Sequence, residues 1–236
     1  MQLTGLKRVR GLGRCARTQA VTLLQRIAVA VALPVLVLPA QAHPHVFVDG
    51  GVDFVFNENG LLSALEVTWL YDEFESLYIL SSNELSLTAA GGLAEADRQH
   101  LIRQRSNWPD DFEGSAHLSV DGAPAVLHRP SGFDVAVVDG RLRVTFTRQL
   151  DVPIDLNQSS AEVAFYEATY FYAFAVTNSP QVLGAPRTCA ADVIPFEAGA
   201  QDTALQAALA KLSREETPDI ARVGSFFADR ISIRCG

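Results

Sequence analysis

The chain of 236 residues lacks the short motifs that mark several common enzyme classes. It has no Gly-x-Ser-x-Gly nucleophile turn and no phosphate-binding P-loop pattern. Cys-x-x-Cys and His-Glu-x-x-His are also absent, so the sequence offers no local signature of dithiol redox or zinc-protease chemistry. It shows no internal repeat, low-complexity tract or domain linker. We therefore predict a single main domain that is not an enzyme.

Acidic residues are missing from the first 42 residues, which carry six of the 19 lysines and arginines. An apolar stretch over residues 27–38 follows the basic region, and the small residues Ala40 and Ala42 come directly after it. This order is typical of a secretory signal peptide. We therefore predict a signal peptide over residues 1–42, cleavage after Ala42, and one domain over residues 43–236.

A membrane anchor is the alternative for this first segment. Pro34 and Pro39 interrupt the apolar stretch, which is shorter than the roughly 20 residues that a spanning helix needs. No cysteine follows the stretch and no twin-arginine pair precedes it. These absences argue against a lipoprotein and favour the general secretory route, so we expect a periplasmic protein without direct membrane insertion.

Positive charge is scarce in the remaining domain. It keeps all 27 acidic residues and 13 of the 19 basic ones, which gives a formal net charge of −14. Such an acidic surface argues against nucleic acid and anionic membranes as partners. It is compatible with cations as ligands.

Strand patterns dominate the domain. Apolar residues alternate with polar ones over residues 46–56, which predicts a half-buried strand. The turn residues 57–60 separate it from a partner strand over residues 61–71. Further strands are predicted over 117–120, 125–128, 134–138, 141–147, 161–166, 170–177 and 230–235. Asp121-Gly122 and Asp139-Gly140 lie between neighbouring strands, where tight hairpin turns need residues that tolerate positive φ.

Helices are predicted over residues 73–81, 94–104 and 203–214. In the last of these, Asp202 is placed to cap the helix, and Leu205, Leu209 and Leu212 form an apolar stripe. Together the patterns predict a mainly β (α+β) fold, an antiparallel β-sandwich-like domain with helical insertions and a C-terminal helix.

Three cysteines are present, and Cys15 would leave with the signal peptide. Cys189 and Cys235 then form one even pair in an oxidising compartment, which favours a disulfide. A pair of thiolate metal ligands is the alternative.

Histidines gather at the predicted new N-terminus. Cleavage after Ala42 would give His43 a free amine, which can chelate one metal ion together with the ring of His43. His45 and then Asp49 fall on the same side of an extended chain. Imidazole and amine ligands suit Zn, Ni, Co or Cu. Pro44 has no amide hydrogen, which excludes the square-planar amide chelate. A disordered leader is the alternative reading.

Two other clusters are interpreted as structural. Asp72, Glu73 and Glu75 begin a predicted helix, where acids favour the helix dipole. The dense aromatic residues of 165–172 are interpreted as a pair of core strands rather than as a ligand cage.

Several segments resemble one bacterial family, the domain-of-unknown-function family number 1007, often labelled the periplasmic component of an uncharacterised ABC-type transport system. The segments that carry the resemblance are residues 43–49, 69–74, 107–108, 112–114, 120–122 and 166–174, with Cys189 and Cys235. The resemblance covers nearly the whole predicted domain. It implies an exported protein that accompanies a nickel/cobalt-type (NicO-like) permease.

The sequence departs from this family in two places. Many members carry an acidic, EF-hand-like loop, whereas residues 85–94 contain no acid here, so we do not expect calcium binding. The family's Tyr-Asp-Pro becomes Tyr166-Glu167-Ala168.

The sequence thus leads to one main functional hypothesis. We expect a periplasmic accessory protein of a transport system that binds or delivers a divalent transition metal (Ni, Co, Zn or Cu) for a membrane permease, through His43, His45 and Asp49. The alternative is a structural or protein-interaction module of the cell envelope that binds no metal.

Overall fold

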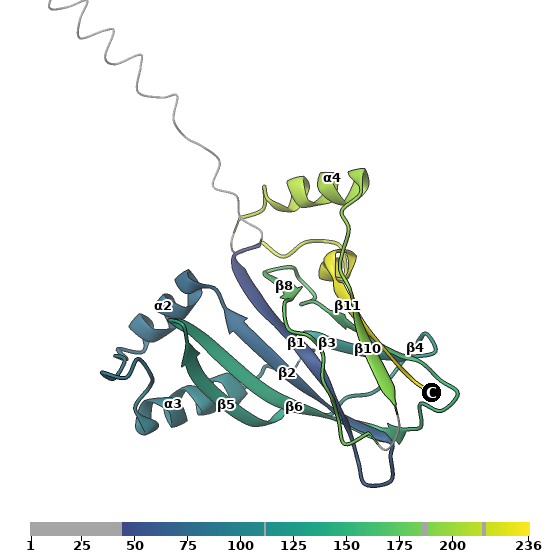
Figure 1. The fold of residues 1–236 in the computed structure, drawn as a ribbon. Coiled ribbons are helices and arrows are strands. Elements are labelled where there is room, and N and C mark those ends of the chain that lie inside the picture. The colour runs from purple at the N-terminus through teal and green to yellow at the C-terminus, as the bar shows by residue number, and fades with distance from the viewer. Residues whose placement is uncertain (1–43, 111, 186–187, 214–215) are drawn as a thin grey trace, which may run out of the picture. The chain divides into compact units, whose positions relative to one another are not determined.

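The computed structural model describes residues 44–110, 112–185, 188–213 and 216–236 (Figure 1). The predicted signal peptide, the cleavage point after Ala42 and the side chain of His43 lie outside these residues. Within the described ranges, no helix has both the length and the apolar character needed to cross a membrane.

Two β-sheets form the body of the domain (Figure 1). The first has the strand order β5-β6-β2-β1-β8, and β9 also pairs with β1. Its strands are β1 (Val46–Phe56), β2 (Leu62–Tyr71), β5 (Ser131–Val138), β6 (Arg141–Ile154), β8 (Tyr172–Val176) and β9 (Val182–Leu183). The second has the order β10-β11-β7-β3-β4, with β3 (Ala116–Val120), β4 (Ala123–Pro124), β7 (Ala161–Phe165), β10 (Cys189–Ile194) and β11 (Asp229–Cys235).

The predicted fold class is confirmed, because the structure is mainly β and its strand pairs are mostly antiparallel. The pairs of β1 with β8 and with β9 are parallel, which the sequence patterns did not indicate. At two hairpin turns, Asp121-Gly122 and Asp139-Gly140 adopt the positive φ angles expected of them.

One hydrophobic cluster joins the two sheets. Alternate residues of β1 are buried, among them Val48 and Phe54, and they pack with Phe165 of β7 and Ile233 of β11. The period-two pattern of the sequence therefore marks the face of the first sheet that the second sheet covers.

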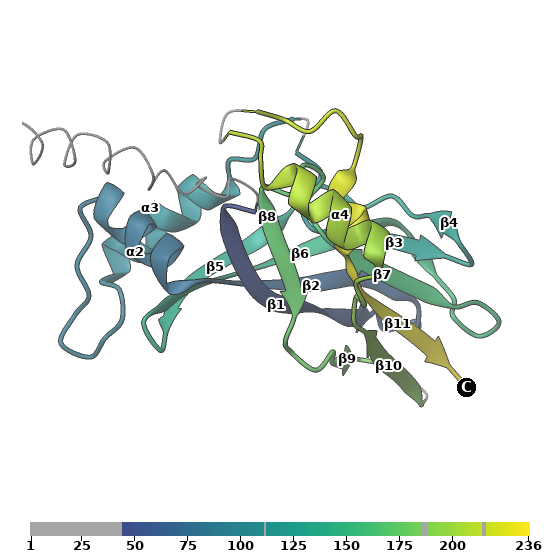
Figure 2. The ribbon, with the colours of Figure 1, turned by 90° about the horizontal axis from the view of Figure 1, so that it is seen from above.

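Helices α2 (Glu73–Ser82) and α3 (Glu95–Ser106) pack beside β6 and β5 (Figure 2). Asp72 caps α2, because its carboxylate accepts a hydrogen bond of 2.7 Å from the amide of Glu75. The buried hydroxyl of Ser76 accepts from the amide of Leu142 at 2.8 Å and so fixes α2 on β6. The interpretation of the Asp72 cluster as structural is confirmed for this cap.

The C-terminal helix lies earlier than predicted. Helix α4 covers Ala200–Leu209 and starts after Gly199. Asp202 sits in the first turn rather than at the cap, and its carboxylate accepts a hydrogen bond of 2.9 Å from the Gly199 amide. Leu209 packs in a small second cluster with Phe227 of the 3-10 helix η1 (Val223–Phe227).

Four other strand assignments needed correction. Residues 125–128 do not form a strand, since they make only an isolated bridge to β6 through Leu127. Ala125 instead donates its amide to β3, while His128 donates to β6 (2.9 and 2.8 Å), so this segment connects the two sheets. The short strands β4 and β9 and the edge strand β10 were not predicted, and β10 is held by its pairing with β11 at the far end of the chain.

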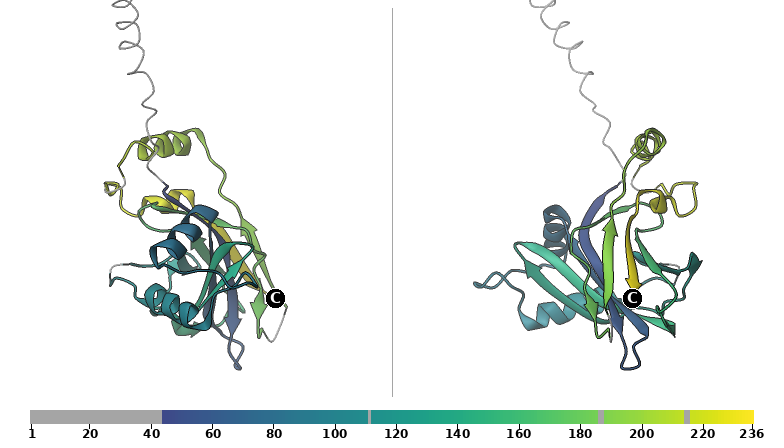
Figure 3. Two further views of the ribbon diagram at one scale, coloured as in Figure 1. Left: turned by 90° about the vertical axis from the view of Figure 1, so that its left-hand side faces the viewer. Right: turned by 45° about the vertical axis from the view of Figure 1, so that its right-hand side comes forward.

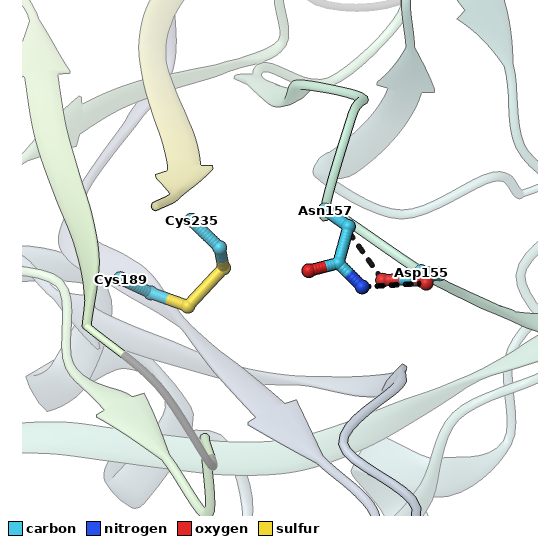
Figure 4. The surroundings of a disulfide bond; sticks show 4 residues. All are labelled: Asp155, Asn157, Cys189 and Cys235. Carbon is cyan, nitrogen blue, oxygen red and sulfur yellow. Dashed lines mark hydrogen bonds between the residues drawn. A yellow bond between two sulfur atoms is a disulfide. The ribbon is translucent and has the colours of Figure 1, made fainter.

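Cys189 and Cys235 form a disulfide across β10 and β11 (Figure 4). They are direct partners in the register of these antiparallel strands, which lie side by side in Figure 3. The bond closes a loop with a sequence separation of 46 residues. It therefore holds the edge strand β10 on the C-terminal strand, and the disulfide favoured by the sequence is confirmed.

Strands β1 and β2 approach closely at Gly50. A Cβ atom at this position would lie 2.0 Å from the carbonyl oxygen of Thr68, whereas a Cβ at Gly51 would lie 3.2 Å from a side-chain carbon of Asn178. We expect Gly50→Ala to lower the free energy of unfolding by at least about 2 kcal/mol, because a backbone oxygen cannot move aside. Gly51→Ala is the matched control with a smaller loss. Urea unfolding checks this, and equal losses would contradict the close approach.

Candidate functional site

His45 is the one proposed metal ligand at the start of β1 that the structure describes in full. Its amide donates a hydrogen bond of 2.9 Å to the carbonyl of Phe171. Its half-buried ring lies against the ring of Phe171, with 4.8 Å between the ring centroids. The residue is therefore held on the segment before β8 and is not part of a loose leader.

Asp49 lies elsewhere on β1 and is already paired. Its carboxylate forms an ion pair of 2.8 Å with Arg141 of β6. Arg141 also donates hydrogen bonds to the carbonyls of Tyr71 (2.7 Å) and Leu70 (3.0 Å). Four residues of strand separate Asp49 from His45, which is about 13 Å. Asp49 thus contributes to a contact that joins three strands, at a distance from His45.

The described part of the chain contains no group of three or more His, Cys, Asp or Glu residues placed to hold a metal ion. This finding does not cover the ligand set proposed at the N-terminus, because His43 lies outside the described residues. The acid-free loop at residues 85–94 is largely exposed and contains hydrogen bonds between Thr88 and Gly92 and between Gly91 and Thr88.

Aromatic side chains converge on Trp69 of β2. Its ring stacks on Trp108, with 5.7 Å between centroids and 5° between planes, and meets Phe146 and Phe174 at 5.0 and 5.5 Å. Its indole nitrogen donates a buried hydrogen bond of 2.7 Å to Ser115. We call the rings around Trp69 the aromatic cluster: Trp69, Tyr71, Trp108, Phe112, Phe146 and Phe174.

A cavity of about 310 Å³ opens beside the aromatic cluster. The aromatic residues Trp69, Tyr71, Trp108, Phe112, Tyr172 and Phe174 line it together with Gln104, Arg105, Asn107 and Pro109. The walls therefore come from segments that are far apart in the sequence: β2, the end of α3, the loop after it, and β8.

A second cavity of about 360 Å³ shares Trp108 and Phe112 with the first among its lining residues. Its polar lining is rich in arginine, with Arg129, Arg148 and Arg222. Arg148 is 8% exposed and donates to the carbonyls of His128 (2.6 Å) and Glu113 (3.0 Å). Burial lowers the pKa of Arg148. Because Arg148 donates these hydrogen bonds to backbone carbonyls, it holds the loops around the cavity in place.

His117 lies between Tyr166 and Arg222 in this second cavity. Its ring stacks on Tyr166 at 4.0 Å, its Nε2 lies 3.1 Å from the Tyr166 carbonyl, and Arg222 lies 3.0 Å from its Nδ1. Burial lowers the pKa of His117 to about 4. A neutral ring with the proton on Nε2 fits both contacts, because it donates to the carbonyl and accepts from Arg222.

Gly114 belongs to residues 112–114, one of the segments that carry the family resemblance, and the structure shows why a glycine fits there. It has a positive φ of 82°, and a Cβ atom here would lie 2.8 Å from the ring of Trp108. Phe112 meets that same ring at 4.9 Å. The segments 69–74, 107–108, 112–114 and 166–174, which are far apart in the sequence, thus meet at the two cavities.

The fold and these cavities define the class of the protein as a β-rich, two-sheet domain built on a buried aromatic cluster. The comparison with protein families then gives the family. The chain belongs to the family described as "Protein of unknown function (DUF1007)", whose sequence model matches residues 28–235. A search of the curated proteins found no match.

Sequence reasoning missed the cavities. It placed the aromatic residues 165–172 in core strands, and Phe165 is indeed fully buried. It gave no role to Arg105, Arg141 or Arg222, because their partners lie far away in the chain. The density of aromatic residues was the available signal, but it did not show which rings leave space between them.

The neutral His117 predicts a pH dependence of stability. Its pKa is about 4 in the folded protein and 6.5 in its ordinary state. The unfolded chain therefore binds a proton that the folded protein excludes, so stability is lost as the pH falls from 6.5 towards 4, by at most about 3 kcal/mol. We expect His117→Gln to flatten this loss in urea titrations at several pH values. The exposed His128→Gln is the control, and an unchanged slope in His117→Gln would refute the assignment.

Proposed function

We propose that the protein is an exported, periplasmic accessory component of a transport system that binds or delivers a divalent transition metal (Ni, Co, Zn or Cu) for a membrane permease. The observation that carries the proposal is the anchoring of His45 on Phe171. It fixes one imidazole directly beside the predicted new N-terminus. The order of basic, apolar and small residues in the first segment supports export.

The donor set that we propose consists of the α-amine of His43, the ring of His43 and the ring of His45. These donors suit the transition metals named. Asp49 fits the set poorly, since metal binding would require it to leave Arg141 and to span the length of strand that separates it from His45. Calcium is not part of the proposal.

Helix α2 offers a surface for the permease. Phe74, Leu77 and Tyr78 are 78%, 65% and 53% exposed, although they are apolar and recur at the spacing of one helical face. An exposed apolar face of this kind is typical of a helix that enters a groove on a partner. Acidic Glu73 and Glu75 stand in the first turn and no basic residue stands in the last. We therefore propose a partner groove with an apolar floor and a basic rim.

Metal titration of the processed protein tests the donor set. Intact mass first establishes that the chain begins at His43. We expect His43→Ala/His45→Ala to weaken the binding of Ni²⁺, Co²⁺, Zn²⁺ or Cu²⁺ at least about tenfold in calorimetry, because two of three donors are lost. An extra residue ahead of His43, which moves the α-amine away, should weaken it as well.

His100→Ala/His128→Ala removes two histidines elsewhere and is the matched control, which should keep the affinity. Asp49→Asn should lower stability and leave the affinity unchanged. If His43→Ala/His45→Ala binds the metal as tightly as the unchanged protein, the proposed site is wrong.

Binding to a purified NicO-like permease in detergent tests the surface on α2. We expect Phe74→Ser/Leu77→Ser to weaken the complex at least about tenfold while the fold is kept, because both side chains already lie in solvent. Val126→Ser, at a position 66% exposed, is the control. Binding that persists with a chelator would favour the alternative of an interaction module without metal, whereas full binding by the α2 variant would exclude this surface.

A further inference from the structure

The cavity beside the aromatic cluster has the composition of a ligand site. Its volume of about 310 Å³ lies at the lower end of the range for small-molecule sites. Its walls are the faces and edges of six aromatic rings, and few polar groups interrupt them. Trp69, Trp108 and Phe174 are at most 9% exposed. A space of this shape, with rigid aromatic walls, suits a ligand with a flat apolar body.

The charge of the residues that line the cavity indicates the charge of the ligand. Arg105 is the only charged residue among its described lining residues. The Nε atom of Arg105 is buried and has no hydrogen-bond partner within the described part of the chain. The same guanidinium donates from Nη2 to the side chain of Gln104 at 3.2 Å, so Nε is the donor without a partner among the described residues, and a ligand acceptor would relieve the cost of leaving it buried. Positive charge at the wall also disfavours a cationic ligand, although aromatic rings alone would attract one.

Tyr71 completes the polar end of the cavity. It is 2% exposed, and the guanidinium of Arg105 lies beside its hydroxyl. Burial raises the pKa of Tyr71, so its hydroxyl stays protonated and can donate a hydrogen bond. Arg105 and Tyr71 thus place two donors at one wall of an otherwise apolar space. Two donors on one side are the arrangement that a carboxylate accepts.

We propose that this cavity binds a small organic anion, a carboxylate carried on a flat apolar body such as an aromatic ring. The ring of the ligand lies in the space beside the stacked pair of Trp69 and Trp108, against the aromatic wall that Phe174 continues. Its carboxylate accepts hydrogen bonds from Arg105 and from the hydroxyl of Tyr71. The site uses neither His43 nor His45, so ligand binding in the cavity can be tested independently of metal binding.

Tryptophan fluorescence reports directly on this cavity, because Trp69 and Trp108 are the only two tryptophans of the chain and both line it. Phenylacetate, phenylacetamide and phenethylammonium are titrated into the full processed protein. They share a ring and differ in charge. We expect saturable binding of phenylacetate, with the amide and the cation at least about tenfold weaker, because only the carboxylate pairs with Arg105.

Arg105→Gln should reduce the affinity for phenylacetate about tenfold or more and abolish the preference for acid over amide. Arg103→Gln, an exposed position on the same helix, is the matched control and should behave like the unchanged protein. Arg105→Lys keeps the charge and should retain a preference for the acid, which guards against a loss of binding through misfolding of the Gln variant.

The proposal is overturned if phenylacetate gives no saturable change, if acid and amide bind equally, or if Arg105→Gln keeps the preference for the acid. A protein that binds phenylacetate equally with and without the His43→Ala/His45→Ala change supports the cavity alone. Loss of metal binding in that variant, measured separately, concerns only the N-terminal site.

Discussion

The packing of Trp69 is the interaction on which the arrangement of both cavities depends. Its ring stacks on Trp108, and its indole nitrogen reaches Ser115, directly before β3 of the second sheet. One side chain of β2 thereby fixes the loop after α3 and the start of β3. Because Trp108 lines both cavities, the position of Trp69 determines where each of them opens. The positive φ of Gly114 allows the chain to pass directly over Trp108, so this loop has little freedom to rearrange.

The two proposed sites lie in separate regions of the domain. At the start of β1, His45 is held on the segment before β8, which gives the proposed metal donors a fixed neighbour. Next to it, β2 and α3 build an aromatic space with a single guanidinium. The exposed face of α2 begins directly after β2, at Asp72, whose carboxylate accepts a hydrogen bond of 2.9 Å from the amide of Phe47. One short connection therefore joins the first strand, the apolar helix face and the aromatic cluster, and a partner on α2 would sit close to both proposed sites.

Much of the fold was predictable from local patterns. The alternation over residues 46–56 and the turn after it predicted the β1–β2 hairpin, because burial on one face alone imposes period two. The Asp-Gly turns were predictable because few residues accept a positive φ. Strand β10 was missed, since its order depends on Cys235 and β11 at the far end of the chain. Of the proposed metal set, Asp49 looked like a continuation of His45 on one face, and only the structure revealed its pairing with Arg141.

The sequence by itself determined the mainly β class, the hairpin at the centre of the first sheet, the cysteine pair and the histidines behind the predicted cleavage point. These features follow from short-range periodicity, turn chemistry and composition, which act within a few residues. Tertiary structure alone decided that β8 runs parallel to β1, that Arg141 forms an ion pair with Asp49, and that Arg105 lines a cavity with aromatic side chains. Those outcomes depend on which distant segments pack against one another. The hydrophobic effect is non-directional, so a local pattern shows that a face is buried and does not show which distant segment covers it.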